Sequence, residues 1–350
     1  MIIYSKKDSF ANSALGKYEQ PIKMLIEYES DLLSKKGGIR DWLFNVEKSN
    51  HYIEGITMQQ GFDIFQGVPE GEGAPKDTIN DTTAHFIEHF QYMKEFTITA
   101  EMMEDAVVGI ASDAKRRIQN FVRSYYNTIN KVCATALVQS EDVDYTYANT
   151  KLNLRCSDGL PLFHNHHIWG YEDGERTGIQ SNYYIGDFAK REGLYNAETL
   201  SDSLYNLAGK LRNMKDENGD PTGYIADTII LPGNKPRLEM LVKQVCGSDG
   251  AAGTTNNDVN IHYGNWNVIV IPTWQTDYDD MMIMSSEANK SLAGNLFFER
   301  VPLTVTPWVD HHTGNYNWTG RCRFGVGFGN YKHIIRVTEN TSVDSVSDLD

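Results

Sequence analysis

Hydrophobic side chains recur at alternating intervals of three and four residues between Thr99 and Ser140. This spacing is typical of a long helix with one buried face, and acidic residues in its first turns match the helix dipole. At 1.5 Å per residue, about forty residues make a rod roughly 60 Å long, longer than a compact small domain is wide. We therefore predict a spine helix over residues 99–140. Its buried face comprises Met103, Val107, Ile110, Ala114, Ile118, Phe121, Tyr125, Ile129, Val132 and Ala136.

A strand-like pattern precedes this helix. The runs HYIEGITMQQGFDIFQG and HFIEHFQYMKEFTITA, both rich in β-branched and aromatic residues, flank the Gly/Pro-containing segment VPEGEGAPKD. Two such runs around a tip of this kind predict a long β-hairpin over residues 51–98. Apolar and polar positions are mixed on both of its faces, so the hairpin cannot bury one face within its own domain. We expect it to project into solvent or to lie across a neighbouring molecule.

The first fifty residues combine a polar segment with one amphipathic stretch. Residues 1–20 show no clear period and predict an extended arm. The stretch PIKMLIEYESDLLSKK begins with Pro21 and ends before Gly37 and Gly38. Proline in the first turn and glycine after the last turn are typical helix boundaries. We therefore predict an arm, a helix that begins at Pro21 and a second short apolar segment, IRDWLFNVE.

The second half of the chain alternates between helical and strand patterns. After a loop-rich stretch, the run ETLSDSLYNLAGKLRNMK has the spacing of a helix, and DTIILP reads as a buried strand. A helix from Pro236 to about Cys246 and the strands NWNVIVIPTW and MMIMSS follow. This order predicts a compact α+β unit. Strand-like runs return afterwards, and the tail TENTSVDSVSDLD is polar and acidic.

Composition limits the class of protein. The chain has 350 residues, of which 40% are hydrophobic and 11% aromatic, enough for a substantial core and about two domains. It has no apolar run of about 18 residues, and its first residues lack the apolar segment of a secretory signal. Four cysteines lie far apart without a CxxC pair, which favours reduced thiols over a disulfide framework. We expect the protein to be made and assembled inside a cell, away from membranes.

The net charge is −15, from 47 acidic and 32 basic residues. Affinity for nucleic acid comes mostly from basic residues that neutralise phosphates, so a chain this acidic is a poor DNA-binding protein as a whole. Lys115, Arg116 and Arg117 form the compact basic cluster of the sequence. A local basic patch stays open there, but we favour a solvated helix face.

Residues His85 to His89 match the pattern HxxEH, an inverted zinc-protease motif. That chemistry needs a helix, because only a helix places both histidines on one face with the glutamate near the bound water. Here the motif lies in a strand-like run, where its two histidines would be roughly 13 Å apart. The spacing excludes two ligands on one zinc ion, so we predict a structural strand.

The segment DGLPLFHNHH contains three histidines in four positions, His164, His166 and His167. His164 and His166 would share one side of a strand, and His311 and His312 are possible additional ligands. A zinc site also requires partners that fix its ligands, and nothing in this spacing requires the rings to converge. We interpret them as structural histidines.

Two further motifs predict structure instead of chemistry. GVGFG, from Gly325 to Gly329, is followed by neither a Lys-Ser/Thr pair nor a helix, so it is no phosphate-binding loop. Its spaced glycines indicate a close approach of another part of the chain. DENGD has Pro221 where a calcium loop requires glycine, and it predicts a turn. We accordingly predict no catalytic, cofactor-binding or metal-binding residue, no cofactor and no enzymatic activity.

Several segments in order resemble a known family. DGLPLFHNHH, LSDSLYNLAGKLRNMKDENGDP, TIILPGNKPRLEMLVKQV and NNDVNIHYGNWNVIVIPTW are similar to the Mu-like major head subunit family. These are major capsid proteins of tailed phages with the Hong Kong 97-type fold. The match is closest over residues 155–275; elsewhere the order of elements agrees. No single motif is diagnostic, but their order and spacing together are fairly specific.

The resemblance implies an α+β fold with an N-terminal arm, an extended hairpin called the E-loop, a P-domain with the spine helix, and an A-domain. Its divisions would be 1–50 for the arm and first helix, 51–98 for the E-loop, 99–195 for the P-domain with the spine helix 99–140, 196–295 for the A-domain, 296–337 for the returning P-domain strands and 338–350 for the polar tail.

The implied function is structural. The family self-assembles into the icosahedral shell that encloses phage double-stranded DNA, so the expected partners are further copies in hexamers and pentamers, with portal, scaffold or decoration proteins. DNA would be enclosed without sequence-specific contact, and assembly would take place in the bacterial host cytoplasm, giving the virion capsid. An acidic wall would avoid holding phosphates tightly. Two alternatives stay open: an encapsulin-like compartment shell and a metal-dependent hydrolase that uses the histidines.

Overall fold

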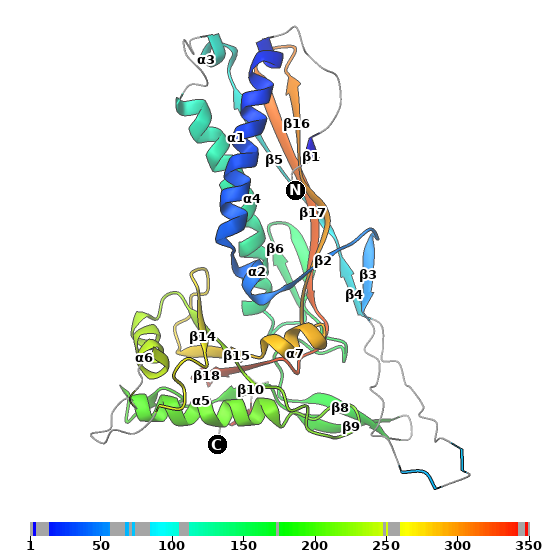
Figure 1. Cartoon of the computed structure of the whole chain (residues 1–350), viewed down its shortest axis with the longest axis vertical. Helices are drawn as coiled ribbons and strands as arrows, with labels where there is room; N and C mark the ends of the chain where they lie inside the picture. Colours follow the sequence, from blue (N-terminus) through cyan, green and yellow to red (C-terminus); the bar gives the residue numbers. More distant parts are fainter. Residues whose placement is uncertain are drawn as a thin grey trace. The chain divides into compact units, whose positions relative to one another are not determined.

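The computed structural model of the chain describes residues 3–4, 14–56, 67–69, 72–73, 85–104, 112–172, 175–247, 250, 260–341 and 347–348. Contacts divide the chain into two units. Unit 1 comprises Met1–Glu54, Glu88–Cys133 and Phe297–Val326, and unit 2 comprises Gly55–Ile87, Ala134–Leu296 and Gly327–Asp350. Each unit combines helices with a β-sheet (Figure 1).

Two long strands form the centre of the sheet in unit 1. They are β16 (Asn295–Val309) and β17 (Tyr316–Phe328). The strand order is β1-β16-β17-β5, and β2 also pairs with β16. The added strands are β1 (Ile3–Tyr4), β2 (Asn45–Lys48) and β5 (Phe90–Ile98). β5 runs antiparallel to β17 along its whole length. The sheet is therefore assembled from distant parts of the sequence.

The helices α1 (Ala14–Lys36) and α4 (Ser112–Val138) lie side by side in unit 1 (Figure 1). The hydroxyls of Ser30 and Tyr126 are 2.9 Å apart and link the two helices. Two shorter helices, α2 (Ile39–Leu43) and α3 (Ala100–Glu104), complete the unit's helical part. The buried core of the helices and the sheet comprises Ile22, Ile26, Ile98, Ala114, Ile118, Phe121, Val122, Leu303, Val305 and Trp318. The apolar residues that recur at intervals of three and four in the sequence therefore form the helix face that packs on the sheet.

Gly320 lets α4 approach β17 closely. A Cβ at this position would lie 2.3 Å from Cζ of Phe121, closer than real Cβ atoms come to another heavy atom. Phe121 also packs against Phe96 of β5, with ring centroids 4.9 Å apart. The missing side chain therefore makes room for an aromatic ring between the helix and the sheet.

Two predictions for the helices need adjustment. The spine helix is confirmed over α4. α3 is a separate short helix, and residues 105–111 lie outside the described residues, so one continuous rod over 99–140 stays a prediction. The prediction that the first helix begins at Pro21 was wrong, because α1 begins at Ala14 and Pro21 lies inside it. The residues before the proline, ALGKYEQ, include good helix formers, and they extend the helix toward the N-terminus.

The predicted hairpin over 51–98 divides between two sheets. β3 (Ile53–Ile56) pairs with β4 (His85–Glu88), and most of the stretch between them lies outside the described residues. The following strand, β5, pairs instead with β17. Aromatic contacts explain this choice of partner, since Tyr92 stacks on Phe324 with centroids 4.6 Å apart. Whether the remaining hairpin lies on a neighbouring molecule stays a prediction.

A six-stranded mixed sheet forms the centre of unit 2. Its order is β14-β13-β15-β18-β10-β19. The central strand β13 is parallel to β14 and antiparallel to β15. The members are β13 (Thr228–Pro232), β14 (Asn267–Ile271), β15 (Asp280–Met284), β18 (Ile334–Thr338), β10 (Tyr183–Ile185) and β19 (Ser347–Asp348). Because β13, β15 and β18 are buried on both faces, their sequences are mostly apolar, as predicted for DTIILP and MMIMSS.

Helices α5 (Ala197–Arg212) and α6 (Pro236–Gly247) pack with the sheet around one core cluster. Asn196 caps α5 by accepting hydrogen bonds from the backbone of Glu198 and Thr199. Smaller elements are α7 (Ser286–Ser291) and the hairpins β6 (Asp144–Tyr147) with β7 (Thr150–Asn153), β8 (His167–Glu172) with β9 (Glu175–Gln180), and β11 (Lys190–Arg191) with β12 (Leu194–Tyr195). The α+β unit predicted from the sequence is present.

The two contact units do not follow the boundaries that the resemblance implied. Residues 134–195, assigned there to the P-domain, group with unit 2. The six-part division by domain names stays a prediction. Among the described residues, none of the helices combines the length and apolar character needed to cross a membrane.

Candidate functional site

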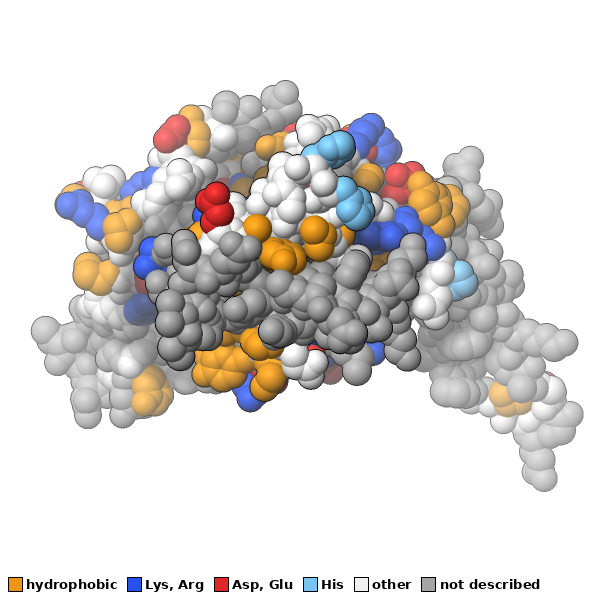
Figure 2. Space-filling model, turned by 90° about the horizontal axis from the view of Figure 1, so that it is seen from above, with side chains coloured by type: hydrophobic (Ala, Val, Ile, Leu, Met, Phe, Trp, Pro, Cys, Tyr) orange, Lys and Arg blue, Asp and Glu red, His pale blue; other side chains and the backbone are white. Residues whose placement is uncertain are grey.

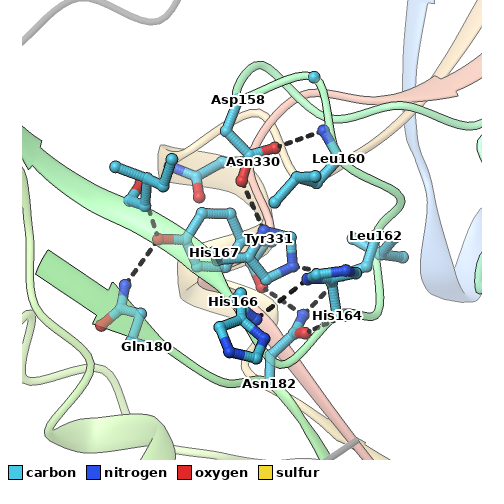
Figure 3. Close-up of polar contacts among 12 residues, drawn as sticks. Asp158, Leu160, Leu162, His164, His166, His167, Gln180, Asn182, Asn330 and Tyr331 are labelled. Carbon is cyan, nitrogen blue, oxygen red and sulfur yellow. Dashed lines mark hydrogen bonds and ion pairs between the residues drawn. The ribbon is translucent and has the colours of Figure 1, made fainter. Parts of the chain in front are cut away.

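The most His-rich segment of the chain forms a turn that leads into β8 (Figure 3). His167 is completely buried. Its Nδ1 lies 2.5 Å from Oδ2 of Asp158, and its Nε2 lies 3.2 Å from the carbonyl oxygen of Leu162. The ring also stacks on Tyr331, with centroids 3.7 Å apart and planes 5° from parallel. Both nitrogens of His167 therefore face acceptors inside the protein.

The other two histidines of this segment are bound locally. The backbone N–H of His166 donates to Nδ1 of His164 over 3.0 Å, and Nδ1 of His166 lies 2.5 Å from the side-chain oxygen of Asn165. Burial, together with the neighbouring histidines, lowers the pKa of His164. Asn182 supports the turn by accepting from the His164 N–H and by donating to the carbonyl oxygen of Leu162.

This geometry favours structural histidines. A metal ligand needs a free lone pair on a ring nitrogen, and the four ring nitrogens named above already have partners within the turn. Among the described side chains, no three His, Cys, Asp or Glu residues are placed to hold a metal ion. His311 and His312 belong to unit 1, where Asp310 accepts from the His312 N–H in the turn between β16 and β17. The absence of a metal site stays a prediction.

The HxxEH motif is in a strand, as predicted. His85 and Ile87 of β4 are buried, whereas Phe86 and Glu88 are exposed on the other face. The glutamate thus points away from the side where His85 lies, so it cannot activate a water bound there. Burial lowers the pKa of His85 to about 4, which keeps its ring neutral near pH 7. Nδ1 of His89 lies 2.9 Å from the carbonyl oxygen of Tyr52.

The glycines of GVGFG mark close approaches, which confirms their predicted role. A Cβ on Gly327 would lie 2.4 Å from Cδ1 of Ile87. A Cβ on Gly329 would lie 2.2 Å from the carbonyl oxygen of Ala293. The segment is part of a packed strand and cannot wrap around a phosphate.

DENGD forms the predicted turn. Oδ1 of Asp216 accepts hydrogen bonds from the backbone of Asn218 and Asp220, both over 2.9 Å. Lys215 and Pro221 form an isolated antiparallel bridge that closes it. The aspartate is used by the backbone of its own turn, which agrees with a structural role.

A buried ion cluster in unit 2 was not found from the sequence. Arg336 of β18 binds Asp280 of the adjacent strand β15, with Nη2 2.5 Å from Oδ2 and Nε 3.0 Å from Oδ1. Its Nη1 lies 2.6 Å from Oε1 of Glu141. Burial raises the pKa of Asp280 to about 6 although the guanidinium opposes this shift. Three rings surround the guanidinium at 5.4 to 5.5 Å: Phe163, Tyr183 and Trp274. The one sequence signal is a charged residue within the apolar run IIRVT.

Exposed apolar side chains mark a second kind of candidate site. Met24, Tyr28 and Leu32 follow one another at intervals of four on α1 and are 64%, 63% and 50% exposed. Residues four apart lie on one face of a helix, so these three form one apolar surface, the α1 stripe. Ile22 and Ile26 on the other side of α1 are fully buried. Figure 2 shows hydrophobic side chains scattered among charged and polar ones on the described part of one face.

The α1 stripe is what a self-associating protein would expose. A row of large apolar side chains in water is stabilised when another surface covers it. Trp42, which follows α1 in α2, is also exposed, at 51%. The structure thus offers a surface suited to binding protein, whereas the sequence motifs that suggested catalysis are used in local packing.

Comparison with known proteins identifies the fold. No family model matches the chain, and no curated protein does. Among solved structures, the capsid of a native GTA particle is 11% identical over 86% of this chain and 89% of its own, with a TM-score of 0.51. The capsid of the cyanophage P-SCSP1u is 10% identical over 87% of each chain, with a TM-score of 0.50. The chain therefore has the Hong Kong 97-type fold of phage capsid proteins, which confirms the predicted fold class. The narrower resemblance to the Mu-like family stays a prediction.

Proposed function

We propose that the chain is the major subunit of a phage capsid. Copies of it would tile into the closed icosahedral shell that encloses double-stranded DNA. The observation that carries this proposal is the likeness of nearly nine tenths of the chain to capsid subunits. The role is structural and uses no catalytic residue.

The exposed surface of α1 supports self-assembly. Complete burial of a large apolar side chain contributes about 1.5–3 kcal/mol, and half-exposed side chains contribute about half of that. Met24, Tyr28 and Leu32 would thus stabilise each contact by on the order of 1 kcal/mol apiece. Such a contact is weak in a pair of subunits, but a shell repeats it in every subunit. We propose a second copy as the occupant of the α1 stripe, because the fold is one from which shells are built.

The wider setting follows from this role. The proposed partners are copies in hexamers and pentamers, together with portal, scaffold or decoration proteins. DNA is enclosed without sequence-specific contact. Assembly takes place in the cytoplasm of a bacterial host, and the mature location is the virion capsid.

Negative-stain electron microscopy of the purified protein tests the proposal. Uniform polyhedral particles, or rings of six and five subunits, are expected. A chain that stays monomeric at all concentrations contradicts it. The neighbouring genes separate the two kinds of shell: terminase and portal genes support a phage capsid, whereas a gene for an enzyme cargo supports a compartment.

A pair of matched variants tests the α1 stripe. The variant M24S/Y28S/L32S removes its apolar side chains, and E27S/D31S/K35S changes three exposed polar residues of the same helix at the same spacing. Light scattering after gel filtration should show smaller species for the first variant and wild-type particles for the second. Circular dichroism checks that both remain folded. If both variants form particles in wild-type yield, a different surface joins the copies.

A further inference from the structure

Helix α4 is strongly basic in an acidic chain. Between Ala114 and Val138 the sequence has five basic residues, Lys115, Arg116, Arg117, Arg123 and Lys131, and no acidic residue. The whole chain has 47 acidic and 32 basic residues. A positive segment within a net charge of −15 is a local feature that the total charge conceals.

Three of these cations lie on one exposed face. Arg116, Asn120, Arg123, Asn127 and Lys131 are spaced by four, three, four and four residues, and all five are exposed. This spacing keeps them on one side of the helix, and we call the set the α4 basic stripe. At 1.5 Å per residue it extends over roughly 22 Å.

The neighbouring elements occupy the two flanks of this face. On one flank the side chain of Gln119 contacts Glu29 of α1 and donates to its carboxylate. On the other, Arg117 donates to the carbonyl oxygen of Thr97 at the end of β5 over 2.8 Å. The α4 basic stripe lies between these flanks and faces away from the core of unit 1. It is therefore available to a partner outside the unit.

The chemistry of the stripe identifies the partner. The centre of a protein–protein interface is apolar and rich in aromatic residues, as the α1 stripe is, whereas the α4 basic stripe contains no apolar side chain. Arginine, lysine and asparagine are among the side chains that contact phosphate oxygens. We propose that the α4 basic stripe contacts the phosphate backbone of the double-stranded DNA inside the shell, without reading its base sequence. This inference rests on the proposed capsid function and adds the surface that meets the DNA.

The contact between the α4 basic stripe and DNA is expected to be weak, which suits a shell that must later release its DNA. Three cations neutralise at most three phosphates per subunit, and the acidic remainder of the chain opposes tighter binding. The contact is therefore weak and sensitive to salt, so it positions the outer turns of DNA but does not prevent their release. A wall that is acidic as a whole, and so does not hold DNA tightly, can therefore also contain a narrow basic stripe that contacts it.

DNA binding by the unassembled full-length chain tests the inference. The probe is a short, fluorescently labelled duplex of mixed sequence, and anisotropy is recorded from about 50 to about 200 mM salt. The variant R116Q/R123Q/K131Q removes the cations of the stripe. The control R191Q/R237Q/K36Q removes two arginines and one lysine from exposed positions elsewhere and has the same net charge. For three lost phosphate contacts, the slope of log K against log salt should become shallower by about 2.7 in the first variant only.

The outcomes separate this inference from the capsid proposal. Wild-type slopes in both variants, equal changes in both, or an absence of wild-type binding at the lowest salt would overturn the role of the stripe. If the stripe variant loses particle formation in electron micrographs while its DNA binding is unchanged, the stripe contacts a second copy and the inference is wrong. If the wild-type chain forms no particles at all, the capsid proposal itself fails, whatever the binding assay shows.

Discussion

Replacing Arg336 by methionine should destabilise unit 2 strongly. The guanidinium binds Asp280 with two nitrogens and Glu141 with a third. The side chain of Asp280 is only 2% exposed, so it cannot reach water once the arginine is gone. Glu141 is 31% exposed and can be solvated instead. Most of the expected loss of stability therefore comes from one buried carboxylate, that of Asp280, which no longer has a counter-ion.

The magnitude follows from the burial of that carboxylate. Removing one partner of a buried ion pair costs about 3–5 kcal/mol, a large share of the 5–15 kcal/mol that stabilises a typical domain. Removing both partners costs less, because no charge is left behind. The double variant R336M/D280L should therefore recover most of the stability lost in the Arg336→Met variant, which is the outcome that a pure packing defect would not produce.

The pH dependence gives an independent check. Burial already raises the pKa of Asp280 to about 6, and loss of the guanidinium raises it further above the value of the unfolded chain, about 3.9. A carboxyl group whose folded pKa is raised contributes stability at low pH and loses it as the pH rises through that pKa. The penalty of the Arg336→Met variant should therefore be larger at pH 8 than at pH 5.

Urea unfolding of the unassembled chain measures these differences. Tryptophan fluorescence, to which buried Trp274 beside the guanidinium contributes as one of six tryptophans, and circular dichroism both follow unfolding. The two probes must agree for the free energies to be meaningful. A loss below about 1 kcal/mol in the Arg336→Met variant, or a double variant less stable than the single one, would refute the reasoning.

Three further variants test local parts of the fold. Burial lowers the pKa of His333 to about 4 against about 6.5 unfolded, so wild-type stability should fall by about 3 kcal/mol as the pH falls through that window, and urea unfolding of His333→Gln should show a smaller fall. Gly320→Ala should cost about 1–3 kcal/mol, and adding Phe121→Leu should restore part of it in thermal unfolding; a neutral alanine would contradict the close approach. Asp158→Asn removes the carboxylate beside buried His167 and should lower the midpoint of urea unfolding by the equivalent of about 1–3 kcal/mol; an unchanged midpoint would show that the turn does not depend on this pair.

The pattern of apolar residues along the sequence predicted those elements in which burial repeats with the period of the helix or strand itself. The spacing of apolar residues predicted α4, since one face of the helix packs on the sheet. The apolar run DTIILP predicted β13, since both of its faces are buried. In these cases the environment of each residue repeats with the period of its own element, so one sequence contains the necessary information.

Other features depend on which distant segments meet, and the pattern along one segment does not contain that information. β5 reads as the return strand of a hairpin, but its partner is β17, more than two hundred residues later in the chain. Arg336 looks like an exception in an apolar strand until Asp280 and Glu141 are placed beside it. Pairing of strands and of buried charges is decided by tertiary packing, which overrides local preference.

The histidine-rich turn illustrates the boundary between these two cases. The sequence favoured structural histidines over a metal site, because nothing in the spacing required convergence. The fold adds the partners of one ring: His167 contacts Asp158, Leu162 and the ring of Tyr331, which come from two separate parts of the chain. A motif that suggests chemistry is therefore best judged by the partners of each ring nitrogen.

The outward faces of α1 and α4 suit two different kinds of partner. An apolar row gains free energy when a second surface excludes water from it, whereas a row of cations keeps its hydration and gains most from a concentrated polyanion. One surface cannot meet both demands, and here the two rows lie on separate, adjacent helices of unit 1. Copies joined through Met24, Tyr28 and Leu32 would leave the α4 basic stripe exposed on the adjacent helix. The two sets of variants should therefore have separable effects, with assembly lost in the first and salt-dependent DNA binding lost in the second.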